Sequence, residues 1–200
     1  MTARETILAA VRAGRRAELP PRYDLPAWPH ERVAEFAARA RSTAAEVHEI
    51  AEIDDAPEAI WNILASRNAA RHVHIPQNSP AHELPWHRAP GLTLTNERPS
   101  GSDAAVSLAD WGIAETGTLV FFSGERNPSS WHFLPGLEFV LVRRELILPR
   151  FENVIDSLSR EGAIPATVNL VTGPSRTADI EQTIERGAHG PRDLCILIAG

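Results

Sequence analysis

Hydrophobic positions along the chain repeat with two different periods, one typical of helices and one typical of strands. Apolar residues recur at three- and four-residue intervals in four segments, which predicts helices after Thr2, over His30–Val47, from Asp55 to Leu64 and over Pro149–Leu158. Short apolar or β-branched runs predict strands at 47–53, 72–75, 92–95, 119–122, 139–142, 168–171 and 194–198. Because strands alternate with helices, the pattern favours an α/β domain with a mainly parallel sheet.

The segment Leu19–Pro29 interrupts this alternation. It holds four prolines together with Tyr23 and Trp28, so we expect an extended arm pinned by its aromatic side chains. Residues 1–29 are therefore predicted to form an N-terminal helix, capped by Thr2, and a proline-rich arm, followed by one α/β domain over 30–200. The helix could pack on that domain or on a second copy, so a homo-oligomer is one expectation.

Composition narrows the class of protein. At 200 residues, 43% hydrophobic and 23% charged, the chain fits one globular domain with a substantial core. It has no apolar run of about 18–20 residues, and its first fifteen residues carry Arg4, Arg12 and Arg15 without a secretory core. We therefore expect a cytoplasmic protein that does not enter a membrane.

Charge and cysteine content argue against nucleic-acid binding and against cysteine-based metal sites and disulfides. A net charge of -6 and a pI near 5.8 give no general attraction to nucleic acid. The single Cys195 excludes an internal disulfide, a four-thiolate zinc site and an iron–sulfur cluster held by this chain alone. Any such cluster is expected in a partner protein.

A polar loop after the predicted strand 168–171 is the clearest candidate for ligand binding, because ligands gather where strands of open α/β sheets end. The loop and the start of the next element supply residue types that hold anions: Gly173, Ser175, Arg176 and Thr177. A short helix predicted over 178–184 would add free amides at its N-terminus. Alternatively, Thr177 only caps that helix, with Asp179 and Glu181 complementing its dipole.

A second glycine-rich loop, 187–191, places His189 beside Gly190. A histidine between glycines can lie close to backbone or ligand, so both residues are predicted to contribute to ligand binding. A simple turn before the last strand explains the loop equally well.

The turn between two apolar segments, Ala114–Thr118, provides the candidate catalytic residue, Glu115. Burial there would favour the protonated carboxyl group and suit Glu115 to act as acid, base or nucleophile. The neighbouring Thr116, Gly117 and Thr118 are predicted to bind ligand. Alternatively, the carboxylate only accepts backbone hydrogen bonds that hold the turn.

Metal and common cofactor sites find little support. A zinc site could be drawn from His72, His74, His82 and His87, but no metal-binding spacing occurs, and solvated histidines explain them more simply. We therefore expect no metal. The chain has no Gly-x-Gly-x-x-Gly motif, no P-loop and no Gly-x-Ser-x-Gly elbow, which argues against dinucleotide binding, P-loop chemistry and serine hydrolysis.

Two long motifs, 110–120 and 172–181 continuing through 187–191, resemble the LUD-domain family, and its lactate-utilisation branch in particular. The resemblance implies a three-layer α/β/α fold related to the sugar-phosphate isomerase and CoA-transferase superfamily. It also implies work beside iron–sulfur partner proteins that oxidise L-lactate to pyruvate. CoA transferases of that superfamily use a glutamate in a Ser-Glu-Asn-Gly turn, and Ala114–Gly117 looks similar, with Thr in place of Asn. Some relatives place a histidine just before the apolar strand 139–142, where this chain has Glu138.

Three functions are consistent with these features. The first is a component of L-lactate utilisation that binds a small anionic ligand at the polar loops and docks iron–sulfur partners. The second is a free-standing enzyme of the transferase or isomerase type, with Glu115 as nucleophile or base. The third is a non-catalytic scaffold.

Overall fold

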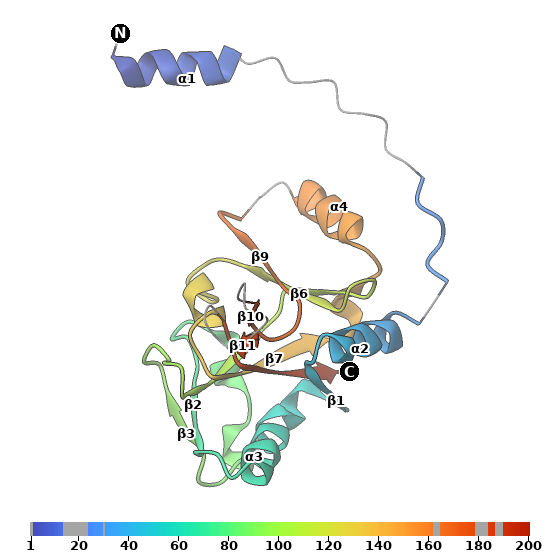
Figure 1. The fold of residues 1–200 in the computed structure, drawn as a ribbon, viewed down its shortest axis with the longest axis vertical. Coiled ribbons are helices and arrows are strands. Elements are labelled where there is room, and N and C mark those ends of the chain that lie inside the picture. The colour runs from blue at the N-terminus through green and yellow to red at the C-terminus, as the bar shows by residue number, and fades with distance from the viewer. Residues whose placement is uncertain (1, 14–23, 30, 162–164, 179–183, 187–189) are drawn as a thin grey trace.

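The computed structural model describes residues 2–13, 24–29, 31–161, 165–178, 184–186 and 190–200, and Figure 1 shows how their elements are arranged. Six strands form the larger sheet, and every neighbouring pair in it runs parallel. Their spatial order is β1 (Glu46–Ile50), β12 (Asp193–Ala199), β7 (Leu137–Arg143), β4 (Ala104–Leu108), β2 (His72–His74) and β3 (Thr93–Thr95). Five of the predicted strands lie here, which confirms the mainly parallel sheet.

Two neighbouring interior strands of this sheet, β7 and β12, are apolar on both faces. Side chains alternate between faces along a strand, so Phe139 and Leu141 join one core cluster while Val140 and Val142 join the other. Such strands read as continuous apolar runs because layers cover both of their faces.

A smaller, mixed sheet lies against one face of the larger one. Its spatial order is β8 (Ile147–Leu148), β5 (Trp111–Ile113), β6 (Thr118–Phe122) and β9 (Val168–Val171). Residues 168–171 form a strand, as predicted, but the prediction that this strand is buried is wrong, since Leu170 is 48% exposed. The reason is that β9 forms an edge of this sheet, paired only with β6 within the described residues.

Helices cover both faces of the parallel sheet, which confirms the three-layer α/β/α fold. On one face, α2 (Arg32–Ser42) buries Phe36, Ala37 and Ala40 between the two sheets. On the other face, α3 (Ala56–Ser66) buries Ile60 and Leu64. The fourth helix, α4 (Phe151–Glu161), packs Val154 and Leu158 on the smaller sheet.

The helix predicted over His30–Val47 is shorter than expected. It ends at Ser42, because Ala44 adopts a positive φ of 70° and the chain then enters β1 at Glu46. Its predicted first residue, His30, lies outside the described residues.

The N-terminal segment follows the prediction where it is described. Thr2 caps α1 (Ala3–Ala13): its Oγ1 accepts the Glu5 amide at 3.3 Å, and the Glu5 carboxylate accepts the Thr2 amide at 2.7 Å. In the arm, the guanidinium of Arg150 lies 5.0 Å from the Trp28 ring centroid and donates to the Pro26 carbonyl at 2.8 Å. Trp28 therefore fastens the arm, whereas Tyr23 lies outside the described residues.

The helix predicted over 178–184 is wrong at both of its ends. Ala178 closes β10 (Arg176–Ala178), Ile184 opens β11 (Ile184–Arg186), and the two strands pair antiparallel. Residues 179–183, the middle of that predicted helix, lie outside the described part of the chain. Backbone pairing between the two short strands takes the place of helical hydrogen bonds at Ala178 and Ile184, so no helix begins at the described residues Thr177 and Ala178. No helix among the described residues has the length and apolar character needed to cross a membrane.

We predict that Gly117→Ala destabilises the fold. Gly117 has a φ of +67°, and a Cβ there would collide with the Ala40 backbone nitrogen in α2. Left-handed backbone alone costs a non-glycine residue about 1–3 kcal/mol. Urea denaturation should show at least that loss in the free energy of unfolding. The matched control is Gly101→Ala, because a Cβ at Gly101 meets nothing within 4 Å. Equal stability of the two variants would contradict the packing of this turn on α2.

Candidate functional site

A pocket of about 520 Å³ lies where β9 ends and where the chain enters β7 and β12. Its volume falls in the range of small-molecule sites, roughly 300–1,000 Å³. It is lined by Thr43, His132, Phe133, Leu170, Val171, Thr172, Gly173, Pro174, Ser175, Gly190 and Pro191. Three residues predicted to bind ligand, Gly173, Ser175 and Gly190, therefore lie in one pocket.

The two polar loops predicted from the sequence meet directly in this pocket. The Ser175 amide donates to the Pro191 carbonyl at 2.9 Å, and a Cβ at Gly190 would lie 2.9 Å from the Cβ of Ser175. Gly173 has a φ of +76°, and a Cβ there would collide with the Thr43 carbonyl oxygen. Glycine is thus required where this loop passes the end of α2.

The turn 114–118 reaches the pocket through a chain of hydroxyl groups. Thr116 Oγ1 lies 2.7 Å from Thr118 Oγ1, which lies 2.8 Å from Thr172 Oγ1 in the pocket wall. Thr118 is buried, whereas Thr116 is exposed. The turn therefore contacts the pocket wall through Thr118 and does not line the pocket itself. On its other side, Gly117 packs on α2.

Glu115 does not occupy the environment expected of it. Its side chain is exposed and does not line the pocket. The prediction that Glu115 is buried, on which its catalytic role was based, is therefore wrong. The physical reason is the turn itself: residues 114–117 turn between β5 and β6, and Glu115 is left on the solvent side while its amide donates to the Pro149 carbonyl at 3.0 Å.

For three predicted ligand-binding residues, Arg176, Thr177 and His189, the side chains lie outside the described part of the structure. Arg176 and Thr177 lie in β10, where the backbone is described. Thr177 begins no helix, so the alternative that it caps one is wrong. His189 lies outside the described residues.

A buried His132–Glu138 pair, which the sequence analysis missed, lies beside the pocket. His132 and Glu138 are both 0% exposed, and Nδ1 of the histidine lies 2.7 Å from Oε1 of the glutamate. Ser107 Oγ donates to the same oxygen at 2.8 Å. The His132 ring stacks on Phe121 with centroids 3.9 Å apart. Among the described residues, neither His132 Nε2 nor Glu138 Oε2 has a hydrogen-bond partner.

Local structure explains how this pair forms. His132 ends a short 3₁₀ turn, Ser129–His132, and Glu138 is the second residue of β7. Ser107 reaches Glu138 from β4, the parallel neighbour of β7. A carboxylate inside a sheet is costly unless it is paired, so Glu138 needs these donors. The available signal was an acidic residue within an otherwise apolar strand.

The pair leaves His132, a pocket-lining residue, with one buried ring nitrogen that has no partner within the described ranges. With Nδ1 hydrogen-bonded to Glu138, Nε2 is the ring nitrogen left to interact with a ligand. A neutral ring could accept a proton at Nε2, and a protonated ring would donate from it, with Glu138 balancing the charge. Thr43, Thr172 and Ser175 add hydroxyl groups to the same wall.

The four histidines considered for a zinc site do not share one environment. His82 and His87 are exposed, as is His72. His74 is buried, so the expectation that all four are solvated is wrong there: its Nδ1 lies 2.8 Å from the Glu97 carbonyl and its Nε2 lies 3.6 Å from Asp103.

We predict that Glu138→Ala lowers the free energy of unfolding by at least about 2 kcal/mol, because it leaves His132 and Ser107 buried without their acceptor. Chemical denaturation measures this loss. Glu152→Ala, an exposed position in α4, serves as the control and should change stability by less than about 0.5 kcal/mol. Similar stabilities for the two variants would contradict the buried pair.

Comparisons with known proteins agree with this architecture. The chain matches the LUD domain over residues 33–199. It is 43% identical over 96 residues to an uncharacterised Neisseria meningitidis protein, covering 48% of this chain and 41% of that one. It is 31% identical over 117 residues to lactate utilization protein C of Halalkalibacterium halodurans, covering 56% and 50%. The chain thus spans about half the length, or less, of these curated relatives.

A solved structure shows the same fold. The crystal structure of a DUF162 family protein from Deinococcus radiodurans superposes with a TM-score of 0.63 at 22% sequence identity. The match covers 85% of this chain and 97% of the other. Because the LUD domain accounts for most of its length, this chain belongs to the LUD-domain family.

Proposed function

We propose that this chain binds a small carboxylate or similar anion in the pocket beside His132, and that this binding serves L-lactate utilisation. The observation that carries the proposal is the buried His132–Glu138 pair: His132 lines the pocket, and one of its ring nitrogens has no hydrogen-bond partner in the described part of the chain. Buried polar atoms without partners are rare in native proteins and call for an explanation, and a ligand supplies one.

Electrostatics favour an anion as the occupant. A protonated His132 forms a neutral ion pair with Glu138, so an anion at Nε2 is attracted by the nearer positive ring. Hydroxyl groups of Thr172 and Ser175 can donate to the oxygens of a carboxylate. The Thr43 hydroxyl, in contrast, already donates to the Ala40 carbonyl at 2.8 Å. The pocket volume of about 520 Å³ leaves room for water beside a three-carbon acid such as lactate or pyruvate.

The pathway is inferred from relatives. Several LUD-domain relatives are named lactate utilization protein C, among them those of Halalkalibacterium halodurans and Geobacillus kaustophilus. We infer that this chain acts in the same process in the cytoplasm, beside iron–sulfur partner proteins. One cysteine, buried in β12, cannot by itself hold a cluster, so the redox centre of this proposal resides in the partners.

The transferase alternative has less support. It rests on Glu115, which is exposed and is not among the residues that line the pocket. Acid–base chemistry in the pocket, if a reaction occurs there, is better assigned to His132.

Growth on L-lactate as sole carbon source tests this proposal. A strain lacking the gene should fail to grow and should be rescued by the wild type, Glu115→Gln and the exposed-histidine control His87→Gln. His132→Gln should not rescue growth, because glutamine cannot supply the ionisable ring. Immunoblots confirm equal protein levels, and normal growth on another carbon source shows that the defect is specific. Affinity purification of the tagged chain from the same cells should bring down iron-containing protein.

Each outcome removes a different part of the proposal. Growth without the gene would refute the role in lactate utilisation. Rescue by His132→Gln at normal protein level would refute the role of the ring, and an iron-free purified complex would refute the iron–sulfur partners.

A further inference from the structure

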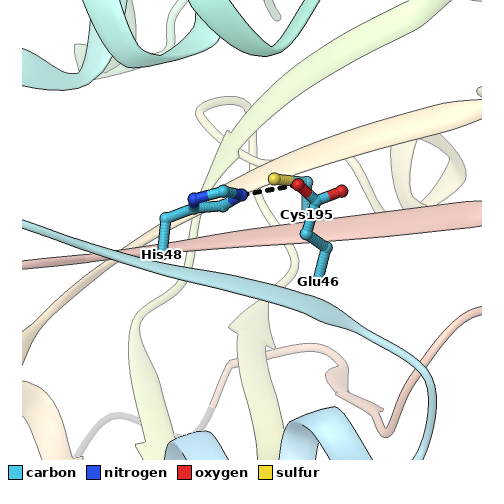
Figure 2. A group of neighbouring side chains, drawn as sticks. All are labelled: Glu46, His48 and Cys195. Atoms are coloured by element: carbon cyan, nitrogen blue, oxygen red, sulfur yellow. Dashed lines mark hydrogen bonds and ion pairs between the residues drawn. The ribbon is translucent and has the colours of Figure 1, made fainter. Parts of the chain in front are cut away.

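Three side chains with metal-binding atoms meet on the parallel sheet, away from the pocket at His132. Figure 2 shows Glu46, His48 and Cys195 side by side on two neighbouring strands. One ligand atom from each lies within 4.8 Å of the others. The three residues line no part of the pocket at His132.

Strand register brings the three together. β1 and β12 pair parallel, with Glu46 directly opposite Cys195 and His48 opposite Leu197. Because side chains alternate along a strand, Glu46 and His48 project from the same face of β1. Cys195 and Leu197 belong to the core cluster that contains α3, so this is the face that α3 covers.

Two neighbouring side chains, His48 and Arg67, hold the Glu46 carboxylate in place. His48 Nε2 lies 2.6 Å from Glu46 Oε1, while Arg67 pairs with Glu46 Oε2. Burial would raise the pKa of Glu46, but the hydrogen bonds from His48 and Arg67 and the charge of Arg67 outweigh it and lower that pKa. One carboxylate oxygen thus contacts His48, and the other pairs with Arg67.

The same three residue types could form a nucleophilic triad, but the environment of the thiol argues against it. Burial, with a further contribution from the charge of Glu46, raises the pKa of Cys195 to about 12. Reactive cysteines instead have lowered pKa values and accessible sulfur atoms. A metal ion overcomes this barrier directly, because thiolate coordination displaces the proton.

We propose that Glu46, His48 and Cys195 bind a divalent transition-metal ion of the zinc class, with water in the fourth position. The donor set of one nitrogen, one sulfur and one oxygen suits such an ion and does not suit Mg²⁺ or Ca²⁺, which prefer oxygen ligands. This departs from the sequence-based expectation of no metal. Binding breaks the His48–Glu46 hydrogen bond and releases the Cys195 proton to solvent.

The surroundings accommodate the ion. Zinc ligands lie about 2.0–2.3 Å from the metal, so in a tetrahedral site they are roughly 3.3–3.7 Å from one another. On binding, His48 Nε2 would move away from Glu46 Oε1, now 2.6 Å distant, and any pair of ligand atoms now farther apart than that range, up to 4.8 Å, would close. Arg67 stays on Glu46 Oε2 and orients the carboxylate from outside, as outer partners of metal ligands do. A pocket of about 340 Å³, lined by Glu46, His48 and Asn62 among others, opens beside the site and gives the ion a path of entry.

Cobalt(II) titration of the chelator-treated full chain tests the site. Cys195 is the sole cysteine, so a thiolate-to-cobalt charge-transfer band can arise from no other residue of this chain. We expect the band in the wild type and in the control His87→Ala, and its loss in Cys195→Ala. His48→Ala should weaken Co²⁺ binding by about tenfold or more. Added Zn²⁺ should displace cobalt and abolish the band.

Two results would overturn the proposal: no band in the wild type, or unchanged Co²⁺ affinity in His48→Ala. Circular dichroism and thermal melting verify that the variants are folded. If Cys195→Ala fails to fold, His48→Ala still decides, because the His48 side chain is 40% exposed and its loss leaves the core intact. None of these variants touches His132, so the outcome is independent of the lactate proposal.

Discussion

The parallel pairing of β7 and β12 is the constraint on which both candidate sites depend. These two strands are neighbours in the interior of the larger sheet and contribute to the core on both of its faces. Because both strands are apolar on both faces, a shift of one residue would still bury apolar side chains, but it would turn Glu138 away from Ser107 or Cys195 away from Glu46. The pairing of β7 with β4 brings Glu138 within reach of Ser107, and the pairing of β12 with β1 sets Cys195 opposite Glu46. The segments that lead into β7 and β12 carry His132 and Gly190 to one pocket.

Two carboxylates of this sheet, Glu138 and Glu46, are at least partly buried, and each needs partners that offset the cost of its burial. Glu138 lies in a fully buried strand, and its cost is offset by hydrogen bonds from Ser107 and His132. The arrangement fixes the imidazole and leaves Nε2 without a described partner. Glu46 is handled differently: it stays at the margin of the sheet, where Arg67 and His48 satisfy it. Glu138 therefore fixes the imidazole ring of His132, which lines the pocket, and Glu46 lies beside His48 and Cys195 in a group of metal-binding atoms.

Much of the architecture could be predicted from local patterns. The apolar run at 139–142 indicates a central strand, and Asp55 with Pro57 marks the start of α3, because burial and the fixed φ of a proline in the first turn act over a few residues. The partial exposure of β9 could not be predicted, since a four-residue apolar run reads alike in a central or an edge strand. The β10–β11 pair was missed because strand pairing there overrides the local preference for a helix.

The candidate site was predictable only in part, for a related reason. The loops with Gly173, Ser175 and Gly190 carry recognisable residue types, and they do meet. The exposure of Glu115 depends on which side of a turn faces solvent, which no local pattern states. The His132–Glu138 pair depends on a 3₁₀ turn folding back over a strand, and the contact between Glu46 and Cys195 depends on the pairing of β1 and β12. Each is a consequence of tertiary structure.

The most direct test of the central claim is an NMR titration of the ¹⁵N-histidine-labelled chain with pyruvate and L-lactate, following the ring nitrogens. Our account predicts a saturable shift of the His132 resonances, assigned by their loss in His132→Gln, while His48 and His87 stay unchanged. Unchanged His132 resonances at high concentrations of both acids would contradict the claim that this ring recognises a small carboxylate.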